Sequence, residues 1–204
     1  MINNENIQDL ERFSKLAAEE FARYASEPRT EEYVKAAELI LEAKAKGNRL
    51  HITGIGKPSH VAEYGASLTS STGTPTYYLH GTEAVHGSWG QLVPGDVVFC
   101  ISNSGETAEL LNTARAIQNN GCAIIAVTGN ENSSLAKLGQ AHLYAGVGQE
   151  GGPLNRAPRA SILAECFALQ KLSVLLQSQY GLDPKQYVKW HPGGTLGHLR
   201  DDEK

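Results

Sequence analysis

Val97-Val98-Phe99-Cys100-Ile101 is the stretch that decides the fold of this chain. A second run of the same kind, Ala123-Ile124-Ile125-Ala126-Val127, follows it after a helical stretch. Both runs are apolar at every position, so neither offers a face suited to water. Strands that are buried on both faces occur in parallel sheets that helices cover on either side. The two runs therefore predict a parallel α/β fold.

The rest of the chain fits this arrangement. Apolar runs at 50–55, 76–79 and 142–145 are further strand candidates, and helical stretches are expected at 57–69, 108–119 and 160–180. Before the first strand, residues 6–26 and 31–46 place apolar side chains at helical spacing. We therefore expect residues 1–47 to form an N-terminal helical arm and residues 48–204 to form one structural unit.

Composition limits the classes of function. The 204 residues carry a net charge of -4, which makes nucleic acid a poor candidate partner. Cys100, Cys122 and Cys166 are widely spaced in apolar stretches, as reduced core thiols of a cytoplasmic protein are. The N-terminus lacks the pattern of a signal peptide, and no apolar run approaches the roughly 20 residues that span a bilayer. A cytoplasmic protein with no membrane partner is expected.

Small and polar residues follow the main strand candidates directly. They occupy residues 53–57, 80–83, 102–107 and 128–130. In an open parallel sheet, the loops after the strands meet at the carboxyl edge, where ligands bind. A binding site is therefore expected at that edge.

Ser102-Asn103-Ser104-Gly105-Glu106-Thr107 is a strand-to-helix turn rich in hydroxyl groups. Free backbone N–H groups at a helix N-terminus, together with the hydroxyls of Ser102, Ser104 and Thr107, suit an anion the size of phosphate. Helix capping by Ser104 or Thr107 is the plainer interpretation, but capping alone requires only one such residue. The turn predicts a phosphate-binding site.

Gly54-Ile55-Gly56-Lys57 also follows a strand and precedes a helix. A dinucleotide fingerprint is excluded, because Ser59 stands at the third glycine position and no acidic residue follows about 20 positions later. The glycine spacing excludes a Walker A loop as well. Lys57 could be a solvated lysine or could reach a sugar or phosphate oxygen in the crevice, and spacing alone leaves both open.

Further acid–base residues lie in loops. His80 and His86 flank Glu83, Glu150 lies in a glycine-containing loop, and His191 lies near the C-terminus. Their spacing does not match that of zinc sites, so no metal is expected. The other histidines are expected to be structural or exposed; they are His51, His60, His142 and His198.

Several motifs occur together in a fixed order. They are Gly54-Ile55-Gly56-Lys57, Ser71-Thr72-Gly73-Thr74-Pro75, Glu83-Ala84-Val85-His86-Gly87, Ile101-Ser102-Asn103-Ser104-Gly105-Glu106 and His191-Pro192-Gly193-Gly194-Thr195-Leu196-Gly197. This series resembles the sugar isomerase (SIS) domain of bacterial arabinose 5-phosphate isomerases, over roughly residues 49–200. The resemblance implies a three-layer α/β domain with a five-stranded parallel sheet. It also implies a homotetramer whose active sites draw residues from neighbouring subunits, and no cofactor.

The resemblance also implies site residues. The polar active-site positions of the family fall on Lys57, His86, Glu109, Glu150 and His191, and its phosphate pocket falls on Ser102, Ser104 and Thr107. Gly56 and Ser71 are expected to contact the substrate as well. Arg159 stands where relatives use Ser or Thr, at the expected start of a helix, and it either places a guanidinium near the substrate or an anionic effector or points into solvent.

The implied reaction interconverts D-ribulose 5-phosphate and D-arabinose 5-phosphate through a cis-enediol, and its product supplies synthesis of the eight-carbon acid Kdo. Such a reaction needs a base with a pKa near neutrality and a donor to the carbonyl oxygen. Glu150 is our first choice for the base and Glu109 the second. His86 and His191 are candidates for ring opening and proton shuttling, and Lys57 for holding sugar oxygens.

The chain departs from the family pattern in three places. Family members commonly carry two CBS modules after the sheet, whereas this sequence ends at Lys204. Arg159-Ala160-Ser161-Ile162 stands where the family usually has Ser and Thr, and Gly81-Thr82 replaces Pro-Gly. These departures bear on substrate detail and feedback control more than on fold or reaction type. Two alternatives are weighed separately: a non-catalytic SIS module that senses a sugar phosphate, and an isomerase of another ketose phosphate.

Overall fold

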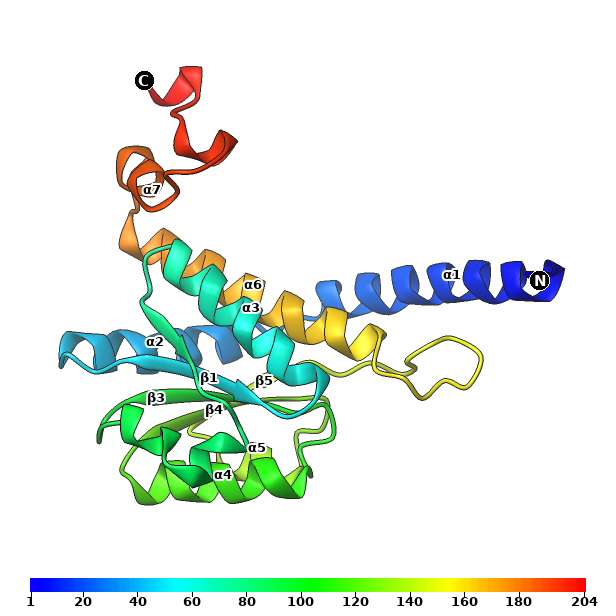
Figure 1. Cartoon of the computed structure of the whole chain (residues 1–204), viewed down its shortest axis with the longest axis horizontal. Coiled ribbons are helices and arrows are strands. Elements are labelled where there is room, and N and C mark those ends of the chain that lie inside the picture. The colour runs from blue at the N-terminus through cyan, green and yellow to red at the C-terminus, as the bar shows by residue number, and fades with distance from the viewer.

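The computed structural model describes residues 1–204 and contains one sheet of five parallel strands (Figure 1). The strands are β1 (Leu50–Gly54), β2 (Thr76–Tyr78), β3 (Val97–Ile101), β4 (Ala123–Thr128) and β5 (Ala141–Tyr144), in the order β2-β1-β3-β4-β5. β3 lies at the centre, where Val97 pairs with Leu50 of β1 and with Ala123 of β4. The predicted five-stranded parallel sheet is confirmed.

Helices cover both faces of the sheet because its central strands are buried on both faces. One face packs against α2 (Thr30–Ala45), α3 (Lys57–Ser71) and α6 (Ala160–Tyr180), around core residues such as Ile52 and Phe99. The other face packs against α4 (Ala108–Asn119) and α5 (Ser134–Leu138), around residues such as Cys100 and Ile124. Figure 1 shows the resulting three layers, so this prediction is also confirmed.

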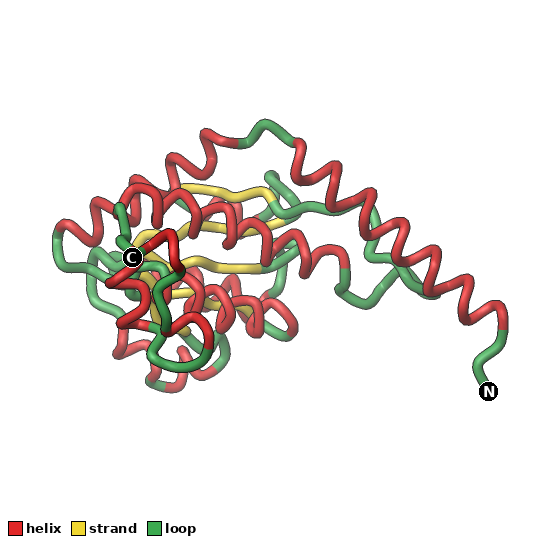
Figure 2. Tube along the Cα trace, turned by 90° about the horizontal axis from the view of Figure 1, so that it is seen from above, coloured by secondary structure: helices red, strands yellow, loops and turns green.

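The two N-terminal helices are placed differently. α2 contributes Ala36, Ala37 and Ile40 to the core beside the sheet. In contrast, α1 (Asn4–Ser26) buries only Tyr24, whose hydroxyl donates to the carbonyl of Tyr144 at 2.7 Å. Most of α1 extends away from the rest of the chain (Figure 2). The predicted boundary at residue 47 stays a prediction. α2 itself packs within a helical layer of the domain.

Judged by length and composition alone, α6 is the one helix that could cross a membrane. However, 50% of its apolar stretch is buried inside the protein. It runs beside α3 in the same direction. Two contacts show this: Gly65 faces Leu169, and farther along both helices the hydroxyl of Thr72 lies 3.2 Å from that of Ser173. A Cβ atom on Gly65 would lie 2.5 Å from a methyl carbon of Leu169, so glycine permits this close approach. The parallel course places the first residues of α3 and α6 at the same edge of the sheet.

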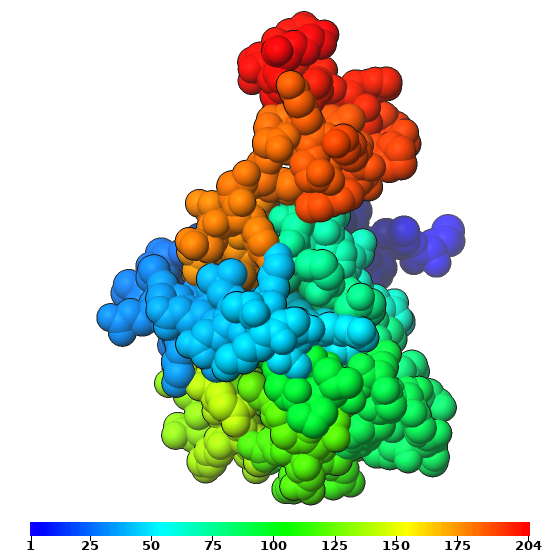
Figure 3. All heavy atoms as spheres, turned by 90° about the vertical axis from the view of Figure 1, so that its left-hand side faces the viewer, coloured from blue at the N-terminus to red at the C-terminus, as the bar shows by residue number.

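The sequence did not predict several short elements. They are α5, α7 (Pro184–Trp190) and four 3-10 turns: η1 (Glu83–His86), η2 (Ser88–Gln91), η3 (Thr195–Gly197) and η4 (Asp201–Glu203). α7 and the residues after it form a separate lobe beyond the end of α6 (Figure 3). No residue of α7 is buried, so this lobe adds nothing to the core.

Candidate active site

The carboxyl edge of the sheet carries most of the predicted site. The strand order reverses at β1, which has β2 on one side and β3 on the other. In this topology, the loops after β1 and β3 diverge and leave a crevice in which ligands bind. Gly54, the last residue of β1, pairs with Ile101, the last residue of β3. The loop that leads to Lys57 and the turn that begins at Ser102 therefore leave the sheet from neighbouring positions. Gly56 is the N-cap of α3 and has a φ of 68°. Lys57, the first residue of α3, is exposed.

The turn from 102 to 107 has the form expected for an anion site. The hydroxyls of Ser102 and Thr107 lie 3.1 Å apart, and the Ser104 hydroxyl accepts from the amide of Glu106 at 3.2 Å. The backbone N–H groups of Asn103, Ser104 and Thr107 donate to no group of the chain. They lie at the N-terminus of α4, whose dipole also favours an anion.

Gly105 shapes this turn. Its φ of 68° is in the left-handed region, and a Cβ atom there would overlap the Ser133 hydroxyl. Glu106 faces α5, where its carboxylate accepts from the amide of Ser134 at 2.7 Å. This hydrogen bond lowers the pKa of Glu106. The glycine and the carboxylate thus hold the turn against α5 and leave its free amides at the sheet edge.

Glu150 connects the loop after β5 to the start of α6. Its Oε2 accepts from the amides of Arg159 at 2.7 Å and Ser161 at 3.1 Å, while Oε1 accepts no hydrogen bond from the chain. The amides of Glu150 and Gly151 both donate to the side-chain oxygen of Asn155 at 2.8 Å. The carboxylate is therefore held by one oxygen, and the other is free to contact a ligand.

A residue that the sequence analysis missed lies one turn into the same helix. Glu165 of α6 is 0% exposed, and neither of its carboxylate oxygens has a hydrogen-bond partner. Burial and then the nearby charge of Glu150 raise the pKa of Glu165 to about 8. The available signal was helical spacing, because Glu165 precedes Leu169 by four residues and so shares its buried face.

His86, Glu109 and Arg159 are exposed. His86 ends the η1 turn after β2, and Glu109 lies in the first turn of α4, so both belong to elements of the carboxyl edge. The Arg159 guanidinium donates to the carbonyl of Gly151 at 3.4 Å and lies 6.0 Å from the ring of Phe13. Its guanidinium therefore lies between the 151 loop and α1.

The structure does not bring Ser71 or His191 to this edge. Ser71 is the last residue of α3, a helix of 15 residues and therefore about 22 Å long, and Lys57 is the first. Trp190, which precedes His191, packs near Gly73 just beyond the same end of α3. Within one chain, both residues thus lie about a helix length from Lys57. The cause is the parallel packing of α6 on α3, which carries the C-terminal lobe to the opposite edge.

His191 is nevertheless ordered by local contacts. Its ring stacks on that of Tyr187 at 4.0 Å, and its Nδ1 lies 2.8 Å from the Tyr187 carbonyl. A carbonyl oxygen can only accept, so Nδ1 carries the proton, and in the neutral ring Nε2 is left unprotonated.

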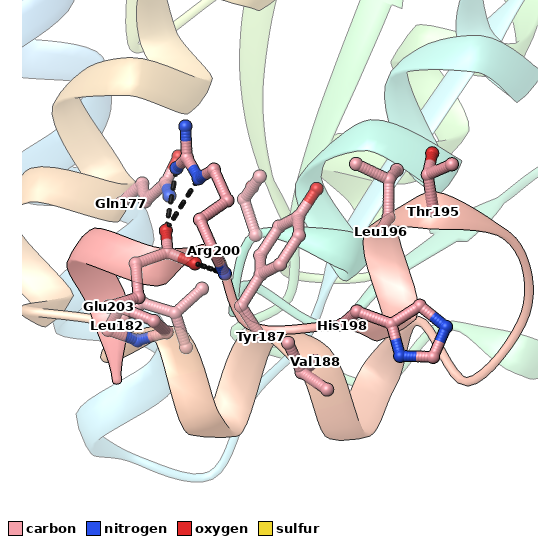
Figure 4. Close-up of a pocket in the computed structure, with 11 residues that line it drawn as sticks. Gln177, Leu182, Tyr187, Val188, Thr195, Leu196, His198, Arg200 and Glu203 are labelled. Atoms are coloured by element: carbon pink, nitrogen blue, oxygen red, sulfur yellow. Dashed lines mark hydrogen bonds and ion pairs between the residues drawn. The ribbon is translucent and has the colours of Figure 1, made fainter.

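A cavity of about 670 Å³ lies in this C-terminal lobe (Figure 4). Tyr187 and Val188 of α7 line it together with His198 and Arg200, and Arg200 is paired with Glu203. It contains none of the residues predicted for the site. Its position at the far end of α3 and α6 separates it from the carboxyl edge.

The four histidines expected to be structural or exposed differ in their surroundings. His51 is buried with its Nε2 3.1 Å from the carboxylate of Asp96, and His142 lies 2.9 Å from the Thr128 hydroxyl. His60 and His198 are exposed. None of the four lies on the loops that form the candidate site.

Comparison with known proteins identifies relatives. The SIS domain family matches residues 43–175. The arabinose 5-phosphate isomerase KdsD of Pseudomonas aeruginosa is 40% identical over 167 residues, which is 82% of this chain and 50% of that protein. The arabinose 5-phosphate isomerase KpsF of Escherichia coli is 36% identical over 166 residues, 81% of this chain and 51% of that protein. The solved structure of E. coli CFT073 c3406 in complex with arabinose 5-phosphate matches with a TM-score of 0.83 and 30% identity, over 94% of this chain and 100% of that chain.

The chain spans about half the length of the curated relatives it matches. The resemblance predicted from the ordered motifs is confirmed, both by the family match and by curated relatives that are themselves arabinose 5-phosphate isomerases. The match covers the sheet, its crossover helices and most of α6. The chain therefore belongs to the SIS domain family.

Proposed function

We propose that this chain is an aldose–ketose isomerase that interconverts D-ribulose 5-phosphate and D-arabinose 5-phosphate. One observation carries the proposal: the carboxyl edge combines free amides and hydroxyls at residues 102–107, the exposed lysine Lys57, and a Glu150 carboxylate with one unoccupied oxygen. The names of the curated relatives and the arabinose 5-phosphate complex of the c3406 protein support this choice of substrate.

The phosphate of the substrate binds at the turn from 102 to 107. The free amides of Asn103, Ser104 and Thr107 and the N-terminal dipole of α4 favour an anion there. Anchoring this end of a short sugar phosphate leaves its carbonyl end to reach toward Lys57 and Glu150. The phosphate thus contributes binding energy that orients the reacting carbons.

The proton transfer follows from the remaining groups. Oε1 of Glu150 removes a proton from C1 of the ketose while O2 gains a proton from Lys57, which gives the cis-enediol and leaves Glu150 protonated. The proton on Glu150 exchanges with solvent and is then delivered to C2, while the O1 hydroxyl returns a proton to Lys57 and becomes the aldehyde oxygen. Lys57 donates to the carbonyl oxygen on which negative charge develops. Glu109 remains the alternative base, because it lies in the first turn of α4 at the same edge of the sheet.

His191 reaches the site from a neighbouring subunit of a homotetramer. Within its own chain it lies at the far end of α3, yet its unprotonated Nε2 suits proton transfer during ring opening of the aldose. His86, from the turn after β2, acts beside it. The active site is therefore shared between subunits of a cytoplasmic enzyme, which needs no cofactor for this reaction and supplies Kdo synthesis.

The test is incubation of the purified chain with D-ribulose 5-phosphate in D₂O, with product followed by proton NMR. Arabinose 5-phosphate should accumulate to equilibrium and carry deuterium at C2, as an enediol that exchanges its proton requires. A panel of hexulose and heptulose phosphates run in parallel should turn over more slowly. Binding of these compounds without turnover would instead identify a sugar-phosphate sensor, and faster turnover of another ketose phosphate would overturn the substrate assignment.

A further inference from the structure

Glu165 is a carboxyl group in an environment that would otherwise be apolar. It lies between Ala164 and Ala168 on the face of α6 that packs on the sheet, and it is fully buried without a hydrogen-bond partner. A buried polar group without a partner costs stability. Titratable groups held in such surroundings cluster at functional sites, because burial tunes their proton affinity. Glu165 is therefore a candidate for a role that packing alone does not explain.

Ser161 lies near Glu165 along α6 and contacts Glu150 through its backbone amide. Its hydroxyl is also buried without a partner, and it lies one helical turn before Glu165 on the same face. The amide of Ser161 donates to Oε2 of Glu150 at 3.1 Å. The Glu150 carboxylate therefore binds the first turn of α6 from the loop after β5, and the Glu165 carboxyl group lies one turn farther along the same helix.

The charge of Glu150 is the one that acts on Glu165. The elements that pack against α6 are α1, α2, α3 and β4, and their titratable groups nearest this end exert no resolved effect on the Glu165 carboxyl. These groups are Glu20 and Arg23 of α1, Glu32 and Tyr33 of α2, and Lys57, His60, Glu63 and Tyr64 of α3. Cys166 on α6 itself has a raised pKa, caused by burial and then by Glu165. No cation is among the groups that act on the pKa of Glu165, and the one charged group that does is the Glu150 carboxylate.

We propose that Glu165 is a positioning residue for the proposed base: Glu150 and Glu165 form a carboxyl pair that holds one proton, with the charge on Glu150 and the proton on Glu165. The catalytic part of this inference rests on the proposed function. The pair itself does not, because it is argued from the burial of Glu165 and from the Ser161 amide, one helical turn away, that binds Glu150. Two carboxyl groups whose surroundings push their proton affinities apart can take the separate roles of base and neutral neighbour.

The pair predicts how the site responds to alkaline pH. While Glu165 is protonated, it adds no negative charge to that of Glu150 at the start of α6. Once Glu165 ionises, a second negative charge lies behind a site that must bind a phosphate and stabilise a developing enediolate. Both tasks become less favourable, so kcat/KM should decrease as Glu165 loses its proton.

The first experiment measures the pair without reference to activity. Carbon-13 NMR of side-chain carboxyl groups follows the titration of Glu165 in the wild type and in Glu150→Gln. If the two carboxyl groups form the pair, Glu150→Gln removes the neighbouring negative charge and should lower the pKa of Glu165. An unchanged Glu165 titration curve in Glu150→Gln would overturn the pair, even if the chain is an active isomerase. Absence of isomerase activity with a normal shift would overturn the proposed function and leave the pair intact.

The second experiment measures the catalytic consequence. The pH profile of kcat/KM is compared for wild type, Glu165→Gln and the matched control Glu63→Gln, which changes an exposed glutamate of α3. Above pH 8 the wild type and the control should lose about tenfold in kcat/KM per pH unit, as expected for one ionisation, and Glu165→Gln should lose this alkaline limb. Superimposable profiles for wild type and Glu165→Gln would overturn the positioning role, since a purely structural residue would not move the profile.

Discussion

The amide of Ser161 donates to the carboxylate of Glu150 at 3.1 Å, which ties the loop after β5 to the first turn of α6. The amide of Arg159 donates to the same oxygen at 2.7 Å. The carboxylate thus takes the place of an N-cap side chain, because Arg159 at the N-cap position makes no side-chain cap itself. The residue proposed as the base therefore also stabilises the helix start, and its substitution must be designed to separate the two roles.

Glu150→Gln makes that separation. The glutamine oxygen can still accept from both amides, so the free energy of unfolding should decrease by at most about 1 kcal/mol. Loss of the base should lower kcat by roughly 10²- to 10⁴-fold. Turnover by NMR and urea denaturation measure the two effects, with Glu63→Gln as the control. Wild-type turnover in Glu150→Gln would contradict the assignment, and an equivalent loss in Glu109→Gln instead would move the base to Glu109.

Shared active sites predict complementation between inactive variants. Lys57→Ala removes a group of the carboxyl edge, and His191→Ala removes one from the far end of the chain. Each variant alone should be inactive, whereas mixed tetramers, formed by co-expression, should recover activity at sites that take Lys57 from one subunit and His191 from another. Mixtures of Lys57→Ala with Glu150→Gln are the matched control, because both residues belong to the same edge of one chain, and they should stay inactive.

Failure of the first mixture to recover activity would place His191 outside the site. Light scattering of the wild type provides an independent check of the assembly. A monomer at micromolar concentration would exclude shared sites altogether.

Glu165→Gln should stabilise the fold, and more at high pH than at low pH. The pKa of Glu165 rises from its ordinary 4.5 to about 8, so the folded state holds a proton that the unfolded state releases between these values. Stability of the wild type is therefore lost as pH rises through this window and levels off above about pH 8. Glutamine removes the penalty, which should amount to as much as about 4 kcal/mol at pH 8 and little at pH 5. Urea denaturation at the two pH values measures it, and equal differences at both would show that Glu165 does not titrate in this range.

Gly105→Ala should disrupt the turn from 102 to 107, where the phosphate is proposed to bind. The substitution meets both a φ of 68° and the Ser133 hydroxyl, which the new Cβ would overlap, so we expect a loss of about 2–4 kcal/mol in the free energy of unfolding and a raised KM. Gly47→Ala is the matched control, because Gly47 has a φ of 80° but no atom within 4 Å of its Cβ position. A stability loss at Gly105 no greater than at Gly47 would show that α5 yields and that the turn is not held rigidly.

The local elements of this protein follow from short stretches of sequence. β3 and residues 123–127 of β4 are apolar at every position, and such side chains are buried on both faces only inside a covered sheet. Both strands and the helices around them were therefore predictable. The turn from 102 to 107 was predictable for a similar reason, since its hydroxyls and glycine directly follow a buried strand. Short elements such as α7 escaped prediction because seven residues with no buried position carry no periodic signal.

The composition of the site depends on contacts that no local pattern encodes. Glu165 looks like any helical glutamate in sequence, and only the packing of α6 on the sheet buries it, removes its partners and sets it beside Glu150. Ser71 and His191 stand in motifs that resemble those of a single site, yet α3 separates them from Lys57 by its own length. The sequence by itself determined which strands form and which residue types are available at their ends, because burial and turn chemistry act over a few residues. The tertiary structure alone decided which of those residues meet and which are desolvated, because both depend on groups far apart along the chain.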